Sequence, residues 1–424
     1  MNMLYRRNQR WDNSSITKIM ITIVMTISFL GVSAGNVINS EKYKYPSHLH
    51  EIRGWVVEQY DEEWYFEQYV GWLDQAIQNP KDEHAWLNCF LAKNYELMSS
   101  EDDIDRDSVF SELLNLMDMY IPDTYTYHAC NYMGLNRGQP DSYASGRKAF
   151  EMLPKKKTFF DYDTWVSFLY LFGDKEYSSY AKEYYNAGIY SKELIQFNLN
   201  ELNCMEEGAI FVGNGDVTII PKWLIQEGMG KHRDKLLICY SYLYNSDYRK
   251  RLYDQLGIGD VPELSEDSSW EEYERYIQTV IDEIAVRTGR KLYMSKYNQD
   301  SCHELWKDRN TIYDIGLVYQ VSPNGEIDIF KEQERVFNNT DFSYLDKTIK
   351  KNAWIADSKM SYTIALNSSY LIFEYKRQNN EAGYKKMLKL AEKATKRISN
   401  DKWREKAQEI VDYYKNDEIE GIEE

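Results

Sequence analysis

The sequence predicts a mostly α-helical protein with an α/β insert, in which tetratricopeptide-like helical hairpins flank a small parallel or mixed sheet. Aromatic residues make up 15% of the 424 residues and recur at helical spacing, whereas there are only 8 prolines. This combination favours stacked helical hairpins over a β-sandwich. Two short apolar runs, separated by a glycine turn and a helix-length segment, indicate parallel strands joined by a crossover helix.

The first 34 residues have the three-part layout of a secretory signal peptide. Four basic residues, the last of them Lys18, precede a 14-residue apolar stretch from Ile19 to Val32. Val32-Ser33-Ala34 then supplies the small residues that signal peptidase accepts. A membrane span needs about 20 apolar residues, so this stretch is short for one. We expect residues 1–34 to be cleaved and the protein to be periplasmic or otherwise exported. The alternative is an uncleaved N-terminal anchor.

The mature chain is predicted to be strongly acidic. Removing residues 1–34 lowers Lys+Arg from 51 to 47 and Asp+Glu from 68 to 67, which leaves a net charge of about −20. Such a surface repels phosphate backbones and anionic lipid head groups, so nucleic acid is excluded as the main partner. No later stretch is apolar for long enough to span a bilayer, so we expect no integral membrane protein after signal cleavage.

The cysteines and histidines show no metal-ligand or redox spacing. The five cysteines are widely spaced without a CxxC pair, and the histidines form no HExxH motif. Cys89 and Cys239 lie in apolar segments and are expected to be buried thiols, with neither a structural disulfide nor a zinc site. We therefore expect no metal and no cofactor.

Three parts are expected in the mature chain: a helical-repeat region at 35–203, an α/β segment at 204–330 and a C-terminal helical-repeat region at 331–424. In the first part, two amphipathic helices between Val56 and Leu97 are separated by the helix stop and restart Asn79-Pro80-Lys81-Asp82. A second pair, within Pro122 to Pro154, resembles a divergent tetratricopeptide repeat in the placement of its alanine, glycine and proline residues. Its helices are expected at Tyr125–Leu135 and Ser142–Leu153, around a turn at Gly138–Asp141.

The remaining helices follow from the same apolar periodicity. Those before the α/β segment are expected at Thr164–Phe172, Lys175–Ala187 and Leu194–Leu202. Those after its first strands are expected at Trp270–Arg287, capped by Gly289, and at Ser361–Arg377, Glu381–Ile398 and Asp401–Tyr414.

Four strands are predicted in the α/β segment. Ala209–Val212 and Leu236–Leu243 are the two apolar runs around the crossover helix, and Lys291–Ser295 follows the Gly289 cap. The fourth is Thr311–Ser322, which is rich in β-branched and aromatic residues and ends at the turn signal Pro323-Asn324-Gly325.

Several short motifs within residues 195–415 follow one another in a distinctive order. They are Asn200-Glu201-Leu202, GAIFVGNGD, Pro221 with Trp223, Gln226, Gly230, Asp234 before an apolar run, Tyr248 and GLVYQVSP. This succession resembles the extracytoplasmic C-terminal region of the bacterial membrane proteins called protein O-mannosyltransferase-like. The resemblance implies an α/β segment followed by tetratricopeptide-like helices. Thr218 stands where that family usually has a second acidic residue, and the membrane-embedded transferase half is absent, so an accessory periplasmic module is implied rather than transfer activity.

The turn after the first strand is the candidate ligand site. Gly213, Asn214, Gly215 and Asp216 lie where a strand-to-helix turn exposes backbone amides and a carboxylate, and Thr218 follows them. The alternative is structural: Asp216 or Thr218 caps the next helix and the glycines supply positive φ angles. The turn lacks the GxGxxG of dinucleotide sites and the lysine of a phosphate loop.

Two other motifs are weaker. Cys302-His303-Glu304 places a thiol beside a base, but adjacent helical residues do not face each other, so a surface helix is the simpler interpretation. The acidic run Glu101–Asp107 lacks the turn glycine and terminal glutamate of a calcium loop, so we expect a solvated loop.

The function expected from these features is that of an exported cell-envelope binding or scaffolding module that contacts a protein or a glycan. Aromatic faces on a concave helical surface suit either ligand, although the same residues suit a repeat core. The alternative is an envelope enzyme, hydrolytic or sugar-modifying, with its site at Gly213–Asp216. The catalytic residues of such an enzyme are unknown from sequence.

Overall fold

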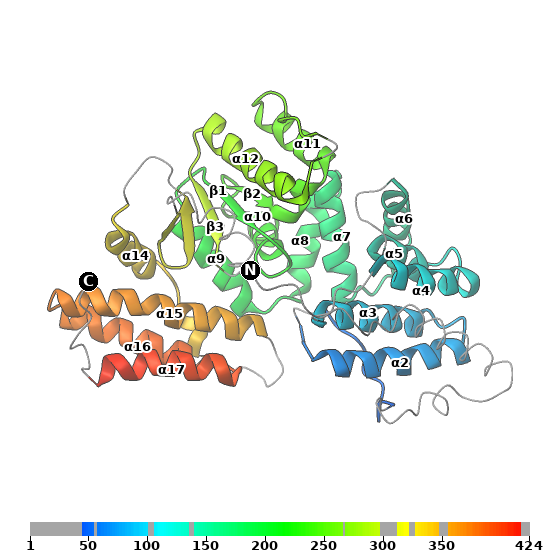
Figure 1. Ribbon diagram of the computed structural model, residues 1–424, viewed down its shortest axis with the longest axis horizontal. Helices are drawn as coiled ribbons and strands as arrows, with labels where there is room; N and C mark the ends of the chain where they lie inside the picture. Colours follow the sequence, from blue (N-terminus) through cyan, green and yellow to red (C-terminus); the bar gives the residue numbers. More distant parts are fainter. Residues whose placement is uncertain are drawn as a thin grey trace. The chain divides into compact units, whose positions relative to one another are not determined.

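The computed structural model in Figure 1 confirms a mostly helical protein with a small mixed sheet. It describes residues 45–54, 57–100, 106–134, 140–265, 268–296, 312–321, 327–346 and 355–416. The predicted signal peptide, residues 1–34, lies outside these ranges. Within them, no helix combines the length and the apolar composition that crossing a bilayer requires.

The chain forms two compact units. Unit 1 comprises Met1–Trp55 and Gln59–Asp161, and unit 2 comprises Val56–Glu58 and Tyr162–Glu424.

Unit 1 is built from successive helices that pack on their neighbours along the chain. Helices α2 (Glu62–Gln78) and α3 (Glu83–Ser99) form the predicted first hairpin, and the break between them falls at Asn79–Asp82 as expected. Asp82 accepts hydrogen bonds from the backbone N–H groups of His84 and Ala85, so it caps α3.

The second predicted hairpin of unit 1 is also present, with an additional helix before it. It consists of α5 (Tyr125–Gly134) and α6 (Pro140–Glu151), and Gly138 and Gln139 of its predicted turn lie outside the described ranges. Helix α6 starts at Pro140, two residues before the predicted start at Ser142. Proline suits a first helical position because no N–H is needed there. Helix α4 (Arg106–Tyr120) was not predicted, although Phe110, Leu113, Leu114 and Met117 have helical spacing and are buried.

Unit 2 contains a five-stranded mixed sheet in the order β2-β1-β3-β5-β4. Strand β1 (Ile210–Gly213) pairs in parallel with β2 (Leu236–Cys239) and with β3 (Leu292–Ser295). Helix α10 (Ile220–Gly228) connects β1 to β2, which confirms the predicted crossover helix. The second strand is shorter than predicted, because the chain turns into a 3-10 helix at Tyr240–Tyr244.

The predicted strand Thr311–Ser322 is wrong as a single element. The chain instead forms β4 (Ile312–Asp314) and β5 (Val318–Val321), which pair antiparallel with each other, while β5 pairs antiparallel with β3. Gly316 lies between the two strands at a φ of +107°, a conformation that residues with a Cβ atom rarely adopt. A glycine inside a β pattern therefore marked a reversal of the chain.

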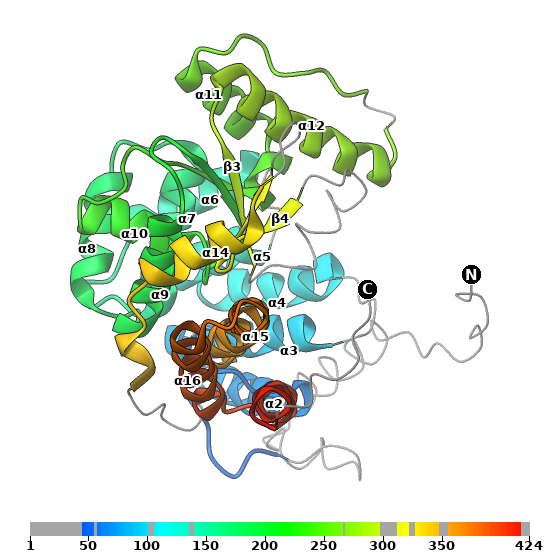
Figure 2. The same cartoon turned by 90° about the vertical axis from the view of Figure 1, so that its left-hand side faces the viewer.

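Helices cover both faces of the sheet, as Figure 2 shows from the side. On one face, Ile210, Val212 and Met294 pack against α12 (Trp270–Thr288) and α11 (Ser246–Leu256). On the other face, Phe211 lies beside Lys222 of α10, which in turn packs on α9 (Lys192–Cys204) and α8 (Tyr177–Ala187). The alternation of buried side chains along β1 thus builds three layers.

The other helices of unit 2 include the predicted C-terminal group. Helices α15 (Ile355–Arg377), α16 (Glu381–Arg397) and α17 (Asp401–Lys415) pack on one another. The bounds of α16 and α17 agree with the predicted ones to within one residue, whereas α15 begins six residues before its predicted start at Ser361. Gly289 ends α12 in the left-handed conformation, as expected. The remaining elements are α7 (Phe159–Phe172), α14 (Ile329–Asn338) and the 3-10 helix Ser343–Asp346. The boundary between the two units falls within α7.

We predict that Gly316→Ala destabilises unit 2 more than Gly188→Ala does. An added Cβ at Gly316 would meet Phe337 Cε2 at 2.9 Å, whereas one at Gly188, at a φ of +64°, meets nothing within 4 Å. Backbone strain costs about 1–3 kcal/mol, and overpacking typically costs another 1–3 kcal/mol. Gly316→Ala should therefore lower the free energy of unfolding by at least about 2 kcal/mol, against about 1 kcal/mol for Gly188→Ala. Urea denaturation measures both, and equal losses would contradict the role given to Gly316.

Candidate functional site

The predicted site lies at the edge of the sheet where its three parallel strands end. Gly213, Cys239 and Ser295 are the last residues of β1, β2 and β3, and the register pairs Gly213 with Cys239. Ligands of parallel sheets bind beyond this carboxyl edge. The edge therefore collects side chains from three separate parts of the sequence.

The glycine turn is closed by its own hydrogen bonds. The Asn214 backbone N–H donates to Thr218 Oγ1 at 3.1 Å, and the Thr218 hydroxyl donates to the Asn214 carbonyl at 2.7 Å. The N-cap of α10 is Ile219, which makes no side-chain cap hydrogen bond. Thr218 therefore stabilises the turn itself, rather than the start of the helix as the structural alternative expected.

The two glycines of the turn meet different requirements. Gly215 has a φ of +75°, which confirms the expected positive φ. Gly213 has no positive φ but is tightly enclosed: a Cβ atom there would lie 2.7 Å from Phe211 Cε1 and 3.0 Å from Thr218 Oγ1. A side chain at position 213 would consequently push the turn away from the sheet.

Asn214 ties the end of β1 to the end of β2. Its Oδ1 accepts a hydrogen bond from the Ser241 backbone N–H at 3.3 Å and lies 3.9 Å from Cys239 Sγ. Burial raises the pKa of Cys239 to about 11, so this thiol is protonated at neutral pH and is a poor nucleophile.

Tyr190 links the backbone of Asp216 to the carboxylate of Asp163. The Tyr190 hydroxyl is 2.8 Å from the Asp216 carbonyl oxygen and 2.9 Å from Asp163 Oδ1, and Tyr184 is 3.4 Å from the same Oδ1. Burial raises the pKa of both tyrosines well above the ordinary value, and the charges of Asp163 and Asp216 add to the rise. These tyrosines therefore act as neutral hydrogen-bond donors around the turn.

A fully buried ion pair lies directly beneath the turn. Lys222 of α10 and Glu201 of α9 each have 0% exposed side chains, and Lys222 Nζ is 2.5 Å from Glu201 Oε2. Nζ also donates to Asn198 Oδ1 at 2.6 Å and to the Thr218 carbonyl at 2.8 Å, while Ser295 donates to Glu201 Oε1 at 3.3 Å. All three ammonium protons have acceptors, so Lys222 holds the turn, α9 and α10 together.

Burial affects the two charges in opposite directions. It raises the pKa of Glu201 and lowers the pKa of Lys222, while the attraction between the two groups works against both shifts. Such a pair persists in a dry core only when its geometry and its additional hydrogen bonds are good.

A second buried lysine lies at the same edge. Lys296 follows β3, and its Nζ bonds to the carboxylate of Asp314 at the end of β4 and to Asn367 Oδ1 of α15 at 2.5 Å. Burial lowers the pKa of Lys296. Asn367 also donates to the Gly316 carbonyl at 2.6 Å, so this cluster fastens the β4–β5 reversal to α15.

The residues of these two clusters and Asp163 were not predicted from the sequence as site residues. A usable signal existed for the first cluster, because Asn198 and Glu201 stand four and seven residues after the apolar Leu194, at the spacing of a buried helix face. Polar residues at such positions indicate a buried polar network. No comparable pattern links Lys296 to Asp314 and Asn367.

Most residues of the two weaker sequence motifs lie outside the part of the chain that the structure describes. Cys302-His303-Glu304 and most of the acidic run Glu101–Asp107 lie outside the described residues, and Asp107 is at the start of α4. Within the ranges that the structure describes, no group of three or more His, Cys, Asp or Glu side chains is arranged to hold a metal ion.

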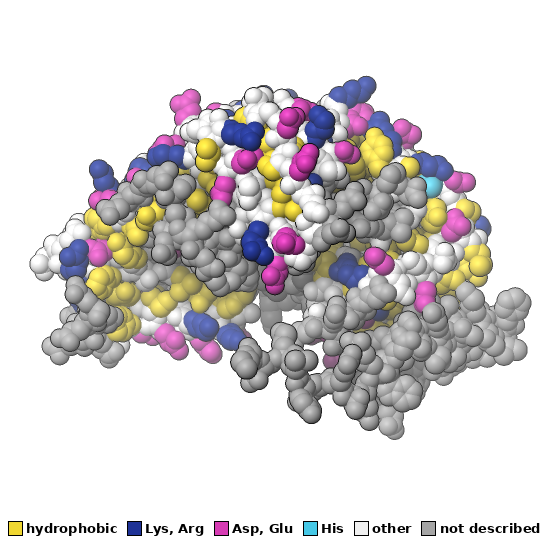
Figure 3. All heavy atoms as spheres, turned by 45° about the horizontal axis from the view of Figure 1, so that its top comes forward, with side chains coloured by type: hydrophobic (Ala, Val, Ile, Leu, Met, Phe, Trp, Pro, Cys, Tyr) yellow, Lys and Arg dark blue, Asp and Glu magenta, His cyan; other side chains and the backbone are white. Residues whose placement is uncertain are grey.

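Charged side chains of both signs are mixed on the face drawn in Figure 3. Pairs on α11 and α12, such as Lys250 with Asp254 and Arg287 with Glu283, have the helical i,i+4 spacing. Among the described residues drawn on this face, charges of the two signs are therefore interspersed and form no patch of one sign.

Comparisons with known proteins give no relative: no family model matches the chain, and neither a curated protein nor a solved structure is significantly similar to it. The site must therefore be interpreted from its own geometry.

We predict that breaking the buried ion pair destabilises the protein strongly. Lys222→Met leaves the Glu201 carboxylate buried without its partner, which costs about 3–5 kcal/mol. The matched control, Lys250→Met, removes an exposed pair with Asp254 and should cost less than about 1 kcal/mol. Adding Glu201→Leu to Lys222→Met should restore part of the loss. Urea denaturation provides the comparison, and similar losses for Lys222→Met and Lys250→Met would refute the assignment.

We also predict that the four described cysteines, Cys89, Cys130, Cys204 and Cys239, are unreactive in the folded protein. They are buried and free, which confirms the expectation for Cys89 and Cys239. Burial raises the pKa of Cys204 to about 12 and also raises those of Cys89 and Cys130. In a Cys302→Ser variant at about pH 8, Ellman's reagent should find no rapidly reacting thiol, and concentrated urea should release four. A rapidly reacting thiol in the folded variant would contradict the burial of these four cysteines.

Proposed function

We propose that the protein is an exported cell-envelope module that binds or scaffolds a protein or glycan partner, with unit 1 as its binding arm. The observation that carries the proposal is the distribution of exposed apolar side chains. Among the described residues, five of the six large hydrophobic side chains that are exposed belong to unit 1, the smaller unit: Tyr45, Met98, Met119, Tyr143 and Met152; the sixth, Val286, belongs to unit 2.

The chemistry of these side chains suits a partner surface. Three of the five are methionines, whose flexible side chains adapt to varied apolar partners. Met119 has 65% of its surface exposed. Helical hairpins that pack in sequence, as in unit 1, also present extended surfaces of the kind that repeat proteins use for binding.

The glycine turn supports this proposal over catalysis. The side chains of Asn214 and Thr218 hold the ends of β1 and β2. Lys222 already donates all its ammonium protons to protein acceptors, and the Cys239 thiol is protonated. One feature favours the enzymatic alternative: the carboxylates of Asp163 and Asp216 lie near the same two tyrosines. A hydrolytic or sugar-modifying site would be built on that pair of acids.

Export and family membership belong to the same proposal. The basic and apolar pattern of residues 1–34 supports secretion, and the GAIFVGNGD and GLVYQVSP motifs support kinship with the extracytoplasmic region of the protein O-mannosyltransferase-like proteins. The α/β layer followed by helices agrees with what that kinship implies.

The test is capture of partners by the tagged mature chain from the envelope fraction of the cells that express it. Met98→Glu, Met119→Glu and Met152→Glu each place a charge on unit 1, and Val286→Glu makes the same change on unit 2. At least one unit 1 variant should lower retention of a defined partner about fivefold or more, the effect of losing a contact worth more than about 1 kcal/mol. Val286→Glu and Asp216→Ala should retain it. Loss confined to Asp216→Ala would overturn the proposal and favour the enzymatic alternative.

A further inference from the structure

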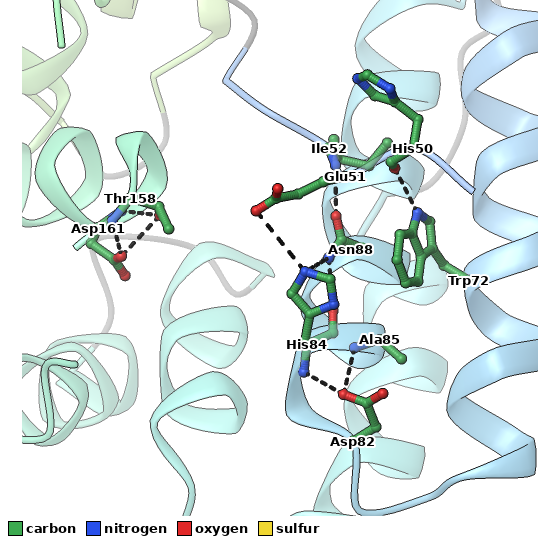
Figure 4. Close-up of polar contacts among 10 residues, drawn as sticks. All are labelled: His50, Glu51, Ile52, Trp72, Asp82, His84, Ala85, Asn88, Thr158 and Asp161. Carbon is green, nitrogen blue, oxygen red and sulfur yellow. Dashed lines mark hydrogen bonds and ion pairs between the residues drawn. The ribbon is translucent and has the colours of Figure 1, made fainter. Parts of the chain in front are cut away.

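An extended segment of the chain, residues 45–54, lies against the α2–α3 hairpin within unit 1 (Figure 4). The helices hold it through its backbone. The Gln68 carboxamide accepts from the His50 N–H at 2.8 Å and donates to the His48 carbonyl at 3.4 Å. A side-chain amide that bonds both an N–H and a C=O of an extended chain imitates a neighbouring β-strand.

Two more side chains continue this pattern along the segment. Trp72 Nε1 donates to the His50 carbonyl at 2.9 Å, and Asn88 Oδ1 accepts from the Ile52 N–H at 2.6 Å. Alternate residues 48, 50 and 52 are thus bound through their main chain, as in peptides that add to a sheet edge. Gln68 and Asn88 are only 3% and 2% exposed, so these amides are positioned rather than mobile.

Residues of α2 and α3 are positioned to contact an extended chain along this face. Asn88 is held in orientation because its Nδ2 donates to the His84 carbonyl at 2.8 Å, one turn earlier in α3. Gly71 of α2 lets the segment approach closely: a Cβ there would lie 2.5 Å from Leu49 Cδ2 and 2.7 Å from Pro46 Cγ. Buried polar side chains cost free energy unless they are bonded, so this face requires a backbone partner.

Side chains of the segment add contacts to these main-chain bonds. The Tyr45 hydroxyl donates to Asp74 Oδ2 at 3.1 Å, and the His50 ring packs edge-on against Trp64 with ring centroids 5.5 Å apart. Pro46, Ile52 and Gly54 are buried, whereas Ser47, His48, Glu51 and Arg53 are exposed. The exposed Glu51 makes only a 4.0 Å contact with His84, which is itself exposed. Main-chain bonds give affinity whatever the sequence, so another extended peptide with apolar residues at the places of Pro46 and Ile52 can satisfy the same groups.

We propose that the face of α2 and α3 carrying Gln68, Trp72 and Asn88 is a binding site for an extended peptide of a partner protein, which the chain's own residues 45–54 occupy in cis. The inference rests on the proposed binding function and specifies its ligand class. The tethered segment competes at an effective concentration in the millimolar range typical of short linkers. A partner peptide therefore binds only when it displaces this segment.

The test uses a fluorescein-labelled peptide with the sequence of residues 45–54, YPSHLHEIRG, and fluorescence anisotropy. The protein is the full mature chain, either unaltered or with His50→Pro and Ile52→Pro, which remove both bound N–H groups from the tethered segment. The altered chain should bind the peptide at least about tenfold more tightly than the unaltered chain, because its site is vacated. A control chain with Ser47→Ala and Arg53→Ala, which changes only exposed side chains, should behave like the unaltered one.

The peptide itself supplies the second arm. Methylating its backbone nitrogens at the positions of His50 and Ile52 should weaken binding by about tenfold or more, since two hydrogen bonds are lost. Alanine at the positions of Ser47 and Arg53 should change it less than about threefold, within the effect of surface contacts.

Three results would overturn the proposal: equal binding to the unaltered and altered chains, no binding to a folded altered chain, or full binding of the methylated peptide. If circular dichroism shows that the proline variant is unfolded, the same binding measurement is made with a chain in which ten Gly and Ser residues replace residues 45–54. Failure here leaves partner capture through the methionines of unit 1 unaffected. Loss of that capture with peptide binding intact would overturn the proposed function alone.

Discussion

The ion pair between Lys222 and Glu201 is the interaction on which the α/β half depends. It joins the crossover helix, the helix before the sheet and the glycine turn, and Ser295 extends it to the third parallel strand. Two unpaired charges in this core would cost several kcal/mol each, so the pair tolerates only one arrangement of these elements. The pair adds little to the net free energy of folding. Its main effect is that any arrangement in which the two charges separate is strongly unfavourable.

Amide side chains have a related role in both units. Asn214 bridges the ends of two strands, Asn367 fastens the β4–β5 reversal, and Gln68 with Asn88 binds the backbone of an extended segment. A carboxamide offers donors and an acceptor like a peptide group, so it can satisfy main-chain groups where no secondary structure does so. In unit 2 these bonds fix the fold. In unit 1 they hold a segment whose removal would leave a site for another chain.

The contacts that stabilise the sheet and the surfaces proposed to bind a partner therefore lie in different units. The glycine turn looked like a ligand site because strand-to-helix turns often are, yet its polar groups mostly support the sheet edge. Unit 1 has no such motif, but among the described residues it carries most of the large exposed apolar side chains, and it holds an extended segment as it would a peptide. Binding surfaces made of main-chain contacts and scattered methionines leave little trace in a sequence, because neither requires a fixed motif.

The sequence alone determined the helical hairpins, the crossover unit and the position of the glycine turn, because helical periodicity, caps and glycines act over a few residues. It did not determine that Gly316 reverses the chain, or that Thr218 closes its turn rather than capping α10. Only the tertiary structure joined Glu201 to Lys222, and Lys296 to Asp314 and Asn367. Those contacts link residues far apart in the chain, and local patterns carry no information on which distant partner satisfies a buried polar group.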